Sequence, residues 1–282
     1  MKHISRSFIR NSYPKKNPWS RKGDFGRLLV IGGSRTYSGA PALVALAAMR
    51  SGCDLVTVAA PERAANIIAS FSPDLITEPM AGNHITNLHT PKILELSEHA
   101  DSVVIGNGLG RENDTALFIR TILSRIDKPC VIDADAISAV SKNKKLIKKN
   151  FIITPHSGEF HILSGIKPSK EINERSKQVR NLSKELGCTI ILKGHADIIS
   201  DSKNTLLNST GNPYMTKGGT GDTLAGICGA FLAMGMSPFN AACSSAYMNG
   251  LAGELAHEKF GSGFLASDIM THISIALKKI LR

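Results

Sequence analysis

The segment Gly218-Gly219-Thr220-Gly221-Asp222 holds the residues of this chain that are best suited to chemistry. Its three glycines let the backbone curl so that several N–H groups point inward. The apolar run 223–234 follows at once and predicts a helix over 224–234. Unpaired N–H groups and the positive end of a helix dipole then meet at one point, which favours a bound phosphate or a phosphoryl group in transfer.

Asp222 is the one residue of this segment that disfavours a phosphate bound in the ground state. A carboxylate beside a phosphate repels it, so Asp222 is better suited to accept the proton of a hydroxyl or water that attacks phosphorus. The alternative is that Asp222 only caps the helix and that the glycines only form a turn. The three glycines in front of Asp222 favour the catalytic interpretation.

Around this segment, short apolar runs alternate with helical patterns. Strands are expected within 27–33, 53–60, 102–106, 129–133, 151–153 and 189–195, and helices over 40–49, from 61 onward, and over 113–124, 170–186, 224–234, 241–259 and 265–281. The alternation predicts an α/β fold with an open, mainly parallel sheet flanked by helices on both faces, and with ligands at the carboxyl ends of the strands. No linker interrupts it, so we predict one domain over 1–282 with a basic lead-in over 1–21.

Several polar residues follow expected strands and are candidates for the same edge of the sheet. Lys193 fits a contact with a nucleotide phosphate, or it simply marks the exit of its strand. Glu159 fits a hydrated Mg²⁺ ion beside a nucleotide, or it is a first-turn acid that complements a helix dipole. For Asp133 and Asp135, catalysis, metal contact and hydrogen bonding of a neighbouring loop all stay open.

The composition is that of an ordinary globular protein with a basic balance. The formal charge is +11, and the positive residues gather in 1–27, in 142–149 and at the end of the chain. They form no aromatic-interleaved stripe, so we predict no nucleic-acid partner and expect the lysines of 142–149 on a solvated helix face. No apolar run approaches the roughly 20 residues that cross a bilayer, and the five scattered cysteines fit a reducing compartment. We therefore expect a cytoplasmic protein with no membrane partner.

Three common site signatures are absent from the sequence. It contains no Walker phosphate loop, no Gly-x-Gly-x-x-Gly after the first expected strand and no Gly-x-Ser-x-Gly. Ordinary hydride-transfer dinucleotide binding and nucleophile-elbow serine chemistry are therefore disfavoured.

A set of short motifs runs in a fixed order from about Lys22 to Ala256. They lie at 22–27, 30–34, 37–41, 106–110, 133–136, 154–159, 192–194, 211–213, 218–222 and 224–226. As a set they closely resemble the ADP/ATP-dependent NAD(P)H-hydrate dehydratases, which belong to the ribokinase-like superfamily. The resemblance implies that a hydroxyl on the ring of hydrated NADH or NADPH is phosphorylated by ADP or ATP and that phosphate then leaves.

The resemblance also implies roles for individual residues. Asp222 would deprotonate the ring hydroxyl while Gly219, Thr220 and Gly221 stabilise the transferring phosphoryl group through backbone N–H groups. Glu159 would act near Mg²⁺. The residues expected to face the hydrated dinucleotide are Ala40, Gly108, His156, Ser157, Gly158, Glu159, Phe160, His161, Ile162 and Asp222. Those expected to hold the adenine nucleotide are Lys193, Gly194, His195, Ala196, Asp197, Asn212, Pro213, Tyr214, Met215, Thr216, Lys217, Gly218, Gly219, Thr220 and Gly221.

Three residues depart from the family pattern. Asn107 stands where proline is expected in Gly-Pro-Gly-Leu-Gly, so that loop is expected to be less rigid. Asp197 takes a threonine-like position, where a carboxylate would repel a phosphate. Asn249 replaces a histidine of a late helix. None of the three lies in the Gly-Thr-Gly-Asp core.

Partners and rival functions follow from the same comparison. The resemblance implies a homo-oligomer, with a tetramer as one expected assembly. Many relatives carry an epimerase domain in front of this one, and 282 residues leave no room for it, so we expect a separate NAD(P)HX epimerase. Two alternatives stay open: a ribokinase-like kinase of a vitamin-precursor alcohol, and a basic protein that binds nucleotide or nucleic acid without turnover.

Overall fold

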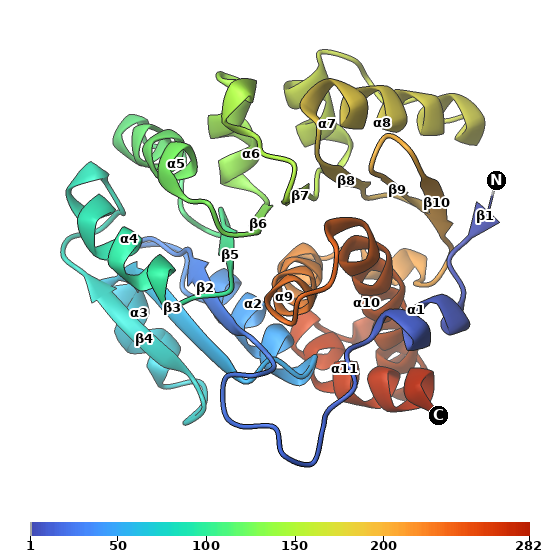
Figure 1. Cartoon of the computed structure of the whole chain (residues 1–282), viewed down its shortest axis with the longest axis horizontal. Helices are drawn as coiled ribbons and strands as arrows, with labels where there is room; N and C mark the ends of the chain where they lie inside the picture. The colour runs from blue at the N-terminus through green and yellow to red at the C-terminus, as the bar shows by residue number, and fades with distance from the viewer. Residues whose placement is uncertain (1) are drawn as a thin grey trace.

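A ten-stranded mixed sheet organises the computed structural model, which describes residues 2–282 (Figure 1). The strands are β1 (Lys2–His3), β2 (Arg27–Ile31), β3 (Leu55–Pro61), β4 (Ile76–Met80), β5 (Ser102–Ile105), β6 (Cys130–Ile132), β7 (Phe151–Ile153), β8 (Thr189–Leu192), β9 (Asp197–Ser200) and β10 (Thr205–Asn208). Their order is β1-β10-β9-β8-β7-β6-β5-β2-β3-β4. The run from β8 to β4 is parallel, β8, β9 and β10 pair antiparallel, and β1 joins β10 in parallel.

Eleven α-helices lie within the described residues. They are α1 (Arg6–Ser12), α2 (Gly39–Arg50), α3 (Glu62–Ala69), α4 (Thr90–Glu98), α5 (Asn113–Arg125), α6 (Asp135–Ser141), α7 (Ser157–Ser164), α8 (Ile172–Leu186), α9 (Thr220–Ala233), α10 (Pro238–Phe260) and α11 (Ala266–Leu281). Short 3-10 turns include η2 (Lys144–Leu146) and η3 (Pro213–Met215). None of the helices within residues 2–282 combines the length and the apolar character needed to cross a membrane.

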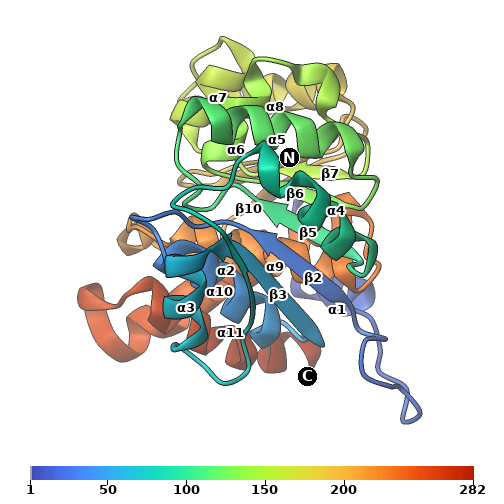
Figure 2. The same cartoon turned by 90° about the vertical axis from the view of Figure 1, so that its left-hand side faces the viewer.

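Each face of the sheet has its own hydrophobic core, because successive side chains of a strand point to opposite faces. In β2, Leu28 and Val30 belong to the first core, whereas Leu29 and Ile31 belong to the second. The first core is covered by α1, α2, α3, α9, α10 and α11, and the second by α4 to α8 (Figure 1, Figure 2). The predicted α/β fold, an open and mainly parallel sheet with helices on both faces, is therefore confirmed.

Close packing of α9 against α2 sets the position of the glycine segment. Gly226 of α9 lies so near the Val44 carbonyl of α2 that a Cβ atom there would overlap it. On the sheet side, Gly229 gives the same close approach to Val104 of β5. These contacts hold the first turn of α9 at the edge of the sheet where the parallel strands end.

Two predicted element ends need correction, and both affect the site. α9 begins at Thr220 instead of 224, so Gly221 and Asp222 lie inside its first turn. The strand expected over 189–195 ends at Leu192, and Lys193 to Ala196 form the turn into β9. The first correction therefore places Gly221 and Asp222 in the helix, and the second places Lys193 in a connection between two strands.

The expected helix at the lysine cluster 142–149 is wrong. Lys142 caps the end of α6, Asn143 leaves the helical region with φ −151° and ψ 78°, and the chain continues through η2. The segment does not return to a regular helix, because Ile147 is extended with φ −76° and ψ 127°. Ile147 is buried in the second core, and Lys148 Nζ donates to Asp127 Oδ1 at 2.8 Å.

Several short elements were not anticipated from the sequence. They are β1, β4, β9, β10, α1, α4, α6 and α7. The basic lead-in, for example, contains β1 and α1, and Ile4 and Ile9 are buried in the first core. Such short segments carry too few residues for a clear periodicity, and pairing with the rest of the chain fixes them.

Candidate active site

A cavity of about 990 Å³ opens where the parallel strands end. Its walls come from the ends of β6 and β8, the start of α7, the segment 209–217, the first turn of α9 and one side of α10. The predicted site residues that line it are His156, Ser157, Lys193, Gly194, His195, Ala196, Asp197, Asn212, Pro213, Met215, Thr216, Lys217, Gly219, Thr220, Gly221 and Asp222. The fold therefore brings the predicted catalytic residues and most predicted nucleotide residues to one cavity.

The first turn of α9 forms an anion-binding end of this cavity. Gly219 caps the helix with φ 94°, in the left-handed region that favours glycine. The Thr220 hydroxyl donates to the carbonyls of Met215 at 3.0 Å and Lys217 at 3.1 Å, which ties the turn to the segment before it. The N–H groups of the first turn have no partner within the helix, so an anion can bind to them and to the helix dipole.

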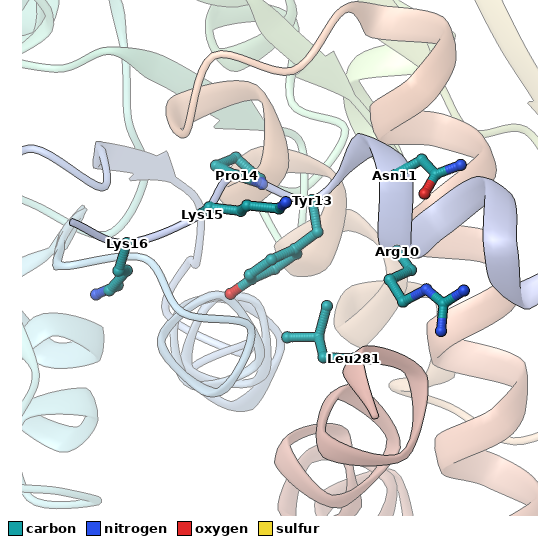
Figure 3. A pocket seen from close by; sticks show the side chains of 7 residues that line it. All are labelled: Arg10, Asn11, Tyr13, Pro14, Lys15, Lys16 and Leu281. Carbon is teal, nitrogen blue, oxygen red and sulfur yellow. The ribbon is translucent and has the colours of Figure 1, made fainter.

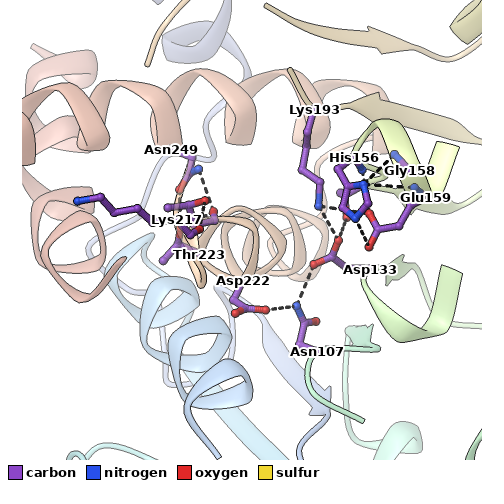
Figure 4. Close-up of polar contacts among 12 residues, drawn as sticks. Asn107, Asp133, His156, Gly158, Glu159, Lys193, Lys217, Asp222, Thr223 and Asn249 are labelled. Carbon is purple, nitrogen blue, oxygen red and sulfur yellow. Dashed lines mark hydrogen bonds and ion pairs between the residues drawn. The ribbon is translucent and has the colours of Figure 1, made fainter. Parts of the chain in front are cut away.

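Asp222 points from this turn toward Asn107 in the loop after β5 (Figure 4). Asn107 Nδ2 donates to Asp222 Oδ1 at 2.6 Å. Burial raises the pKa of Asp222 to about 6, and the charge of Asp133 adds to the rise. The Asn107 hydrogen bond and the Lys193 ammonium act against it. A carboxyl group whose pKa lies near the working pH is well matched to act as a general base.

Asp133 is the centre of a buried polar network beside Asp222. Its Oδ1 accepts hydrogen bonds from Thr154 Oγ1 at 2.6 Å and from Lys193 Nζ at 3.0 Å. Its Oδ2 accepts a hydrogen bond from Asn107 Nδ2 at 2.9 Å. Both oxygens are therefore occupied. Of the roles left open for Asp133, the structure shows hydrogen bonding of its neighbours.

Lys193 carries a positive charge to the wall of the cavity. Burial by itself would lower the pKa of Lys193, but the carboxylates of Asp133 and Glu159 outweigh it and raise the pKa above its usual value. A side chain built at Gly221 would begin 3.3 Å from Lys193 Nζ. The ammonium and the N–H groups of the glycine turn therefore face the same place, as a phosphate site requires.

Glu159 closes a capping box at the start of α7. Its Oε2 accepts the N–H of His156 at 2.8 Å, and His156 Nδ1 accepts the N–H groups of Gly158 at 2.9 Å and of Glu159 at 3.2 Å. Glu159 Oε2 lies 3.9 Å from Lys193 Nζ. Burial raises the pKa of Glu159, and the Lys193 charge opposes that rise. The helix-capping alternative for Glu159 is therefore present in the structure.

The predicted substrate residues Ala40 and Gly108 are neighbours, although they do not line the cavity described above. A Cβ atom at Gly108 would lie 3.4 Å from Ala40 Cβ and 2.8 Å from Tyr37 Cβ. Gly108 directly follows Asn107, the partner of Asp222. Gly108 therefore belongs to the loop that contacts Asp222 through Asn107, and Ala40 packs against that loop.

The predicted substrate residues at the start of α7 and along it do not all lie in the cavity. His156 and Ser157 line the cavity, whereas His161 and Ile162 are exposed outside it. Phe160 is only 1% exposed and belongs to the second core. The expectation that Phe160 faces the substrate needs correction, because the helical turn directs its side chain to the sheet.

Two predicted nucleotide residues, Tyr214 and Gly218, lie outside the cavity lining. Tyr214 stacks on His257 of α10 with ring centroids 4.6 Å apart. Lys217 lines the cavity, but its Nζ donates to the carbonyls of Ser262 and Phe264 and lies 4.5 Å from the centre of the Phe264 ring. The charge of Lys217 is therefore directed to the connection before α11.

The other two residues that depart from the family pattern, Asp197 and Asn249, also have structural partners, as Asn107 does. Asp197 Oδ1 accepts the N–H of Gly194 at 3.0 Å, and Asp197 Oδ2 accepts a hydrogen bond from Asn208 Nδ2 at 3.0 Å. Burial raises the pKa of Asp197. Asn249 accepts from the Thr223 hydroxyl at 2.8 Å (Figure 4). These side chains hold the cavity wall in place, and such roles leave no local sequence signal.

A second cavity, of about 880 Å³, lies where the segment after α1 passes the end of α11 (Figure 3). Its lining residues are Arg10, Asn11, Tyr13, Pro14, Lys15, Lys16 and Leu281. The Tyr13 hydroxyl donates to the Ser51 carbonyl at 3.2 Å. None of the predicted site residues lines this cavity, so it is not part of the candidate active site.

Comparison with known proteins gives one family. The family model described as NAD(P)H-hydrate dehydratase matches residues 28–274. The chain is 40% identical over 277 residues to the ADP-dependent (S)-NAD(P)H-hydrate dehydratase of Cenarchaeum symbiosum, covering 98% of this chain and 96% of that protein. It is 44% identical over 265 residues to the bifunctional NAD(P)H-hydrate repair enzyme of Methanothermobacter thermautotrophicus, covering 92% of this chain and 51% of that protein. The chain thus spans about half the length of the bifunctional relatives it matches.

Solved structures share the fold. A ribokinase-like superfamily protein of Enterococcus faecalis matches with a TM-score of 0.87 at 27% identity, covering 99% of this chain and 96% of that one. The ADP/ATP-dependent NAD(P)H-hydrate dehydratase of Bacillus subtilis, co-crystallised with ATP and Mg²⁺, matches with a TM-score of 0.81 at 25% identity, covering 99% and 98%. The expected ribokinase-like fold is therefore confirmed.

Proposed function

The chain belongs to the NAD(P)H-hydrate dehydratase family, and from this premise we propose that it is an ADP- or ATP-dependent (S)-NAD(P)H-hydrate dehydratase. Its substrates are then NAD(P)HX, the hydrated form of NADH or NADPH, and an adenine nucleotide. The observation that carries the proposal is the place of Asp222. This half-buried carboxyl lies between the anion-binding turn of α9 and the loop that holds Asn107 and Gly108.

The geometry supports a phosphorylation followed by an elimination. Asp222 takes the proton of the ring hydroxyl, and the hydroxyl oxygen bonds to the terminal phosphorus while the bond to the leaving nucleotide oxygen breaks. The N–H groups of the glycine turn, together with Lys193, stabilise the negative charge of the phosphoryl group. Phosphate then leaves with the C–O electron pair, and loss of a proton from the adjacent ring carbon restores the dihydropyridine.

Mg²⁺ fits this site as an ion bound mainly by phosphate oxygens and water. Within residues 2–282, no group of three or more His, Cys, Asp or Glu side chains could hold a metal ion by itself. Mg²⁺ at nucleotide sites commonly takes one or two carboxylates besides phosphates and water. Glu159 is the carboxylate we propose, because it lies directly behind His156 and Ser157 of the cavity wall. Its Oε2 accepts the His156 N–H, and its Oε1 lies 3.4 Å from His156 Nε2, a contact that the ion would replace. The ion would neutralise phosphate charge.

The test is a reconstitution with hydrated NADH, Mg²⁺ and either ADP or ATP. We expect near-ultraviolet dihydronicotinamide absorbance and free phosphate to appear in equal amounts, and only when nucleotide is present. Parallel reactions with each nucleotide, and with hydrated NADPH, identify the preferred donor and substrate.

The rival functions give different products in the same experiment. A ribokinase-like kinase would consume nucleotide and release a stable phosphorylated alcohol without restoring absorbance. A binding protein would consume no nucleotide, and salt-dependent binding of DNA or RNA would support a nucleic-acid role. Either result would contradict the dehydratase proposal.

We extend the proposal to assembly and partners. The protein is proposed to act as a homo-oligomer, with a tetramer as the candidate assembly, and in cooperation with an NAD(P)HX epimerase on a separate protein. The bifunctional repair enzymes among the relatives support a link between two repair activities. We also propose that the chain forms one catalytic domain over 1–282, built on a single sheet. Sedimentation and a coupled assay with purified epimerase test the first two points.

A further inference from the structure

We infer that Asn107 is a positioning residue that holds Asp222 as a proton acceptor by donating its side-chain amide to Asp222 and Asp133 at once. The inference deepens the proposed function, on which it rests, because nothing in the family comparison assigns Asn107. The amide nitrogen lies 2.6 Å from Asp222 Oδ1 and 2.9 Å from Asp133 Oδ2. One planar amide thus spans two acids that are 89 positions apart, as their numbers 133 and 222 give.

The orientation of this amide is determined by its surroundings. Asp133 Oδ1 is already occupied by Thr154 Oγ1 and Lys193 Nζ, so only its Oδ2 faces Asn107. If the amide were rotated by half a turn, its oxygen would face two carboxylate oxygens and repel both. Only the donor side of Asn107 can therefore face Asp222.

The backbone of Asn107 is held as firmly as its side chain. Its carbonyl accepts the N–H of Gly33 at 2.9 Å, and it lies so near Gly32 that a Cβ there would come within 2.6 Å. The residue is fully buried. The expectation of a less rigid loop, drawn from the missing proline, is therefore not what these contacts indicate.

A purely structural role explains Asn107 poorly. Its Oδ1 is buried without a hydrogen-bond partner within residues 2–282. An unpaired buried carbonyl oxygen destabilises a fold, and an apolar side chain of similar shape would avoid that loss. The presence of an amide at position 107 is accounted for by what its nitrogen does, which is to fix one oxygen of Asp222 and leave the other for the substrate.

The charged and polar groups around Asp222 determine how a substitution should change its pKa. Asp133 at the end of β6 and Asp135 in α6 favour the protonated form, whereas Lys193 after β8 and the Asn107 amide favour the ionised form. Removing the amide alone should raise the pKa of Asp222. The loss of one hydrogen bond to a charged carboxylate corresponds to a pKa rise of about one to two units.

The experiment is an NMR titration of the ligand-free protein. The Asp222 carboxyl carbon is assigned by its loss in Asp222→Asn, and its pKa is compared among wild type, Asn107→Leu and Asn249→Leu. Asn249 is a matched control, because it is also buried and also bonds to the first turn of α9, but it does not touch the carboxylate. We expect the pKa to rise by about one to two units in Asn107→Leu and to stay unchanged in Asn249→Leu.

A second readout needs no folded Asn107 variant. In the wild type, the side-chain amide protons of Asn107 should titrate with Asp222, near pH 6, and this step should vanish in Asp222→Asn. An amide signal that is indifferent to Asp222, or equal pKa changes in both leucine variants, would overturn the inference.

Kinetics separate this inference from the proposed function. If the protein dehydrates NAD(P)HX, the acidic limb of its kcat profile should move with the Asp222 pKa in Asn107→Leu, while KM for nucleotide is unchanged. If the protein does not dehydrate NAD(P)HX, the proposed function fails. The titration then still decides whether Asn107 positions Asp222.

Discussion

Lys193 Nζ lies 3.0 Å from Asp133 Oδ1 and forms the central ion pair of the cavity (Figure 4). The pair joins the end of β8 to the end of β6 and places a cation beside the glycine turn of α9. A phosphate that binds there meets a lysine already oriented by a buried acid. The same pair thus contributes both to stability and to anion binding, and the two contributions can be separated by substitution.

Replacing Lys193 by methionine should weaken binding of ADP or ATP with Mg²⁺ by about 10- to 150-fold. The estimate assumes the loss of one hydrogen bond to a charged phosphate, about 1.5–3 kcal/mol. The variant should also lose about 3 kcal/mol of unfolding free energy, because Asp133 is left buried without its cation. Calorimetric titration and urea unfolding measure the two effects.

The control is the double variant Lys193→Met with Asp133→Asn. It should recover much of the lost stability, because no uncompensated charge stays buried, but it should not recover nucleotide affinity. Wild-type affinity in the double variant would show that Lys193 does not bind the nucleotide.

Replacing Asp222 by asparagine should abolish turnover, with a loss in kcat of at least about 10²-fold, because the amide cannot accept the hydroxyl proton. Nucleotide binding should be retained, since the N–H groups of the α9 turn and Lys193 are untouched. The kcat of NAD(P)HX conversion and the Kd for nucleotide are the quantities to compare. An Asn variant with normal turnover would disprove the role of base.

The raised pKa of Asp222 also predicts a pH-dependent difference in stability. The pKa is about 6 in the folded protein against an ordinary value of 3.8, so the folded state binds the proton more tightly. Between these values, rising pH favours the unfolded state at this site. Asp222→Asn, which carries no charge, should therefore gain Tm relative to wild type as pH rises from 4 to about 7. A constant Tm difference across this range would contradict the burial of an ionisable Asp222.

Asp197 offers a test of the turn that carries the predicted nucleotide residues. Asp197→Ala frees the N–H of Gly194 and the amide of Asn208, so we expect nucleotide affinity to fall by about 5- to 10-fold, the equivalent of one lost hydrogen bond. Asp201→Ala is the matched control. Its carboxylate closes the β9–β10 turn by accepting N–H groups of Lys203 and Asn204, away from the cavity. If both variants bind nucleotide normally, Asp197 has no part in the site.

Gly226→Ala should destabilise the fold strongly. The added methyl group would overlap the Val44 carbonyl, and α2 and α9 must then move apart. Gly218→Ala is the control, since a Cβ there meets no atom within 4 Å. Thermal unfolding should show a large fall in Tm for Gly226→Ala and almost none for Gly218→Ala. Equal Tm values would mean that the helices do not approach as described.

Much of the fold and of the site follows from local patterns in the chain. The apolar runs that become β2, β5 and β7 are recognisable because a buried parallel strand needs continuous apolar residues. The Gly-Gly-Thr-Gly-Asp segment predicts a phosphate turn because glycine spacing and helix polarity are local properties. Short elements such as α7 and β9 have no such local pattern, because their few residues are fixed by contacts with distant segments. The sequence therefore does not predict them.

The sequence by itself determined the fold class, the family and the identity of Asp222 as the reactive candidate. Only the tertiary structure decided what surrounds that carboxyl. Asn107 reaches Asp222 across 115 positions of the chain, and Lys193 reaches Asp133 across 60. Neither contact has a local signature, because the fold brings the carboxyl ends of β5, β6 and β8 and the first turn of α9 together from distant parts of the sequence. Since charge and burial act through space, the pKa of the base depends on those neighbours and not on its own segment.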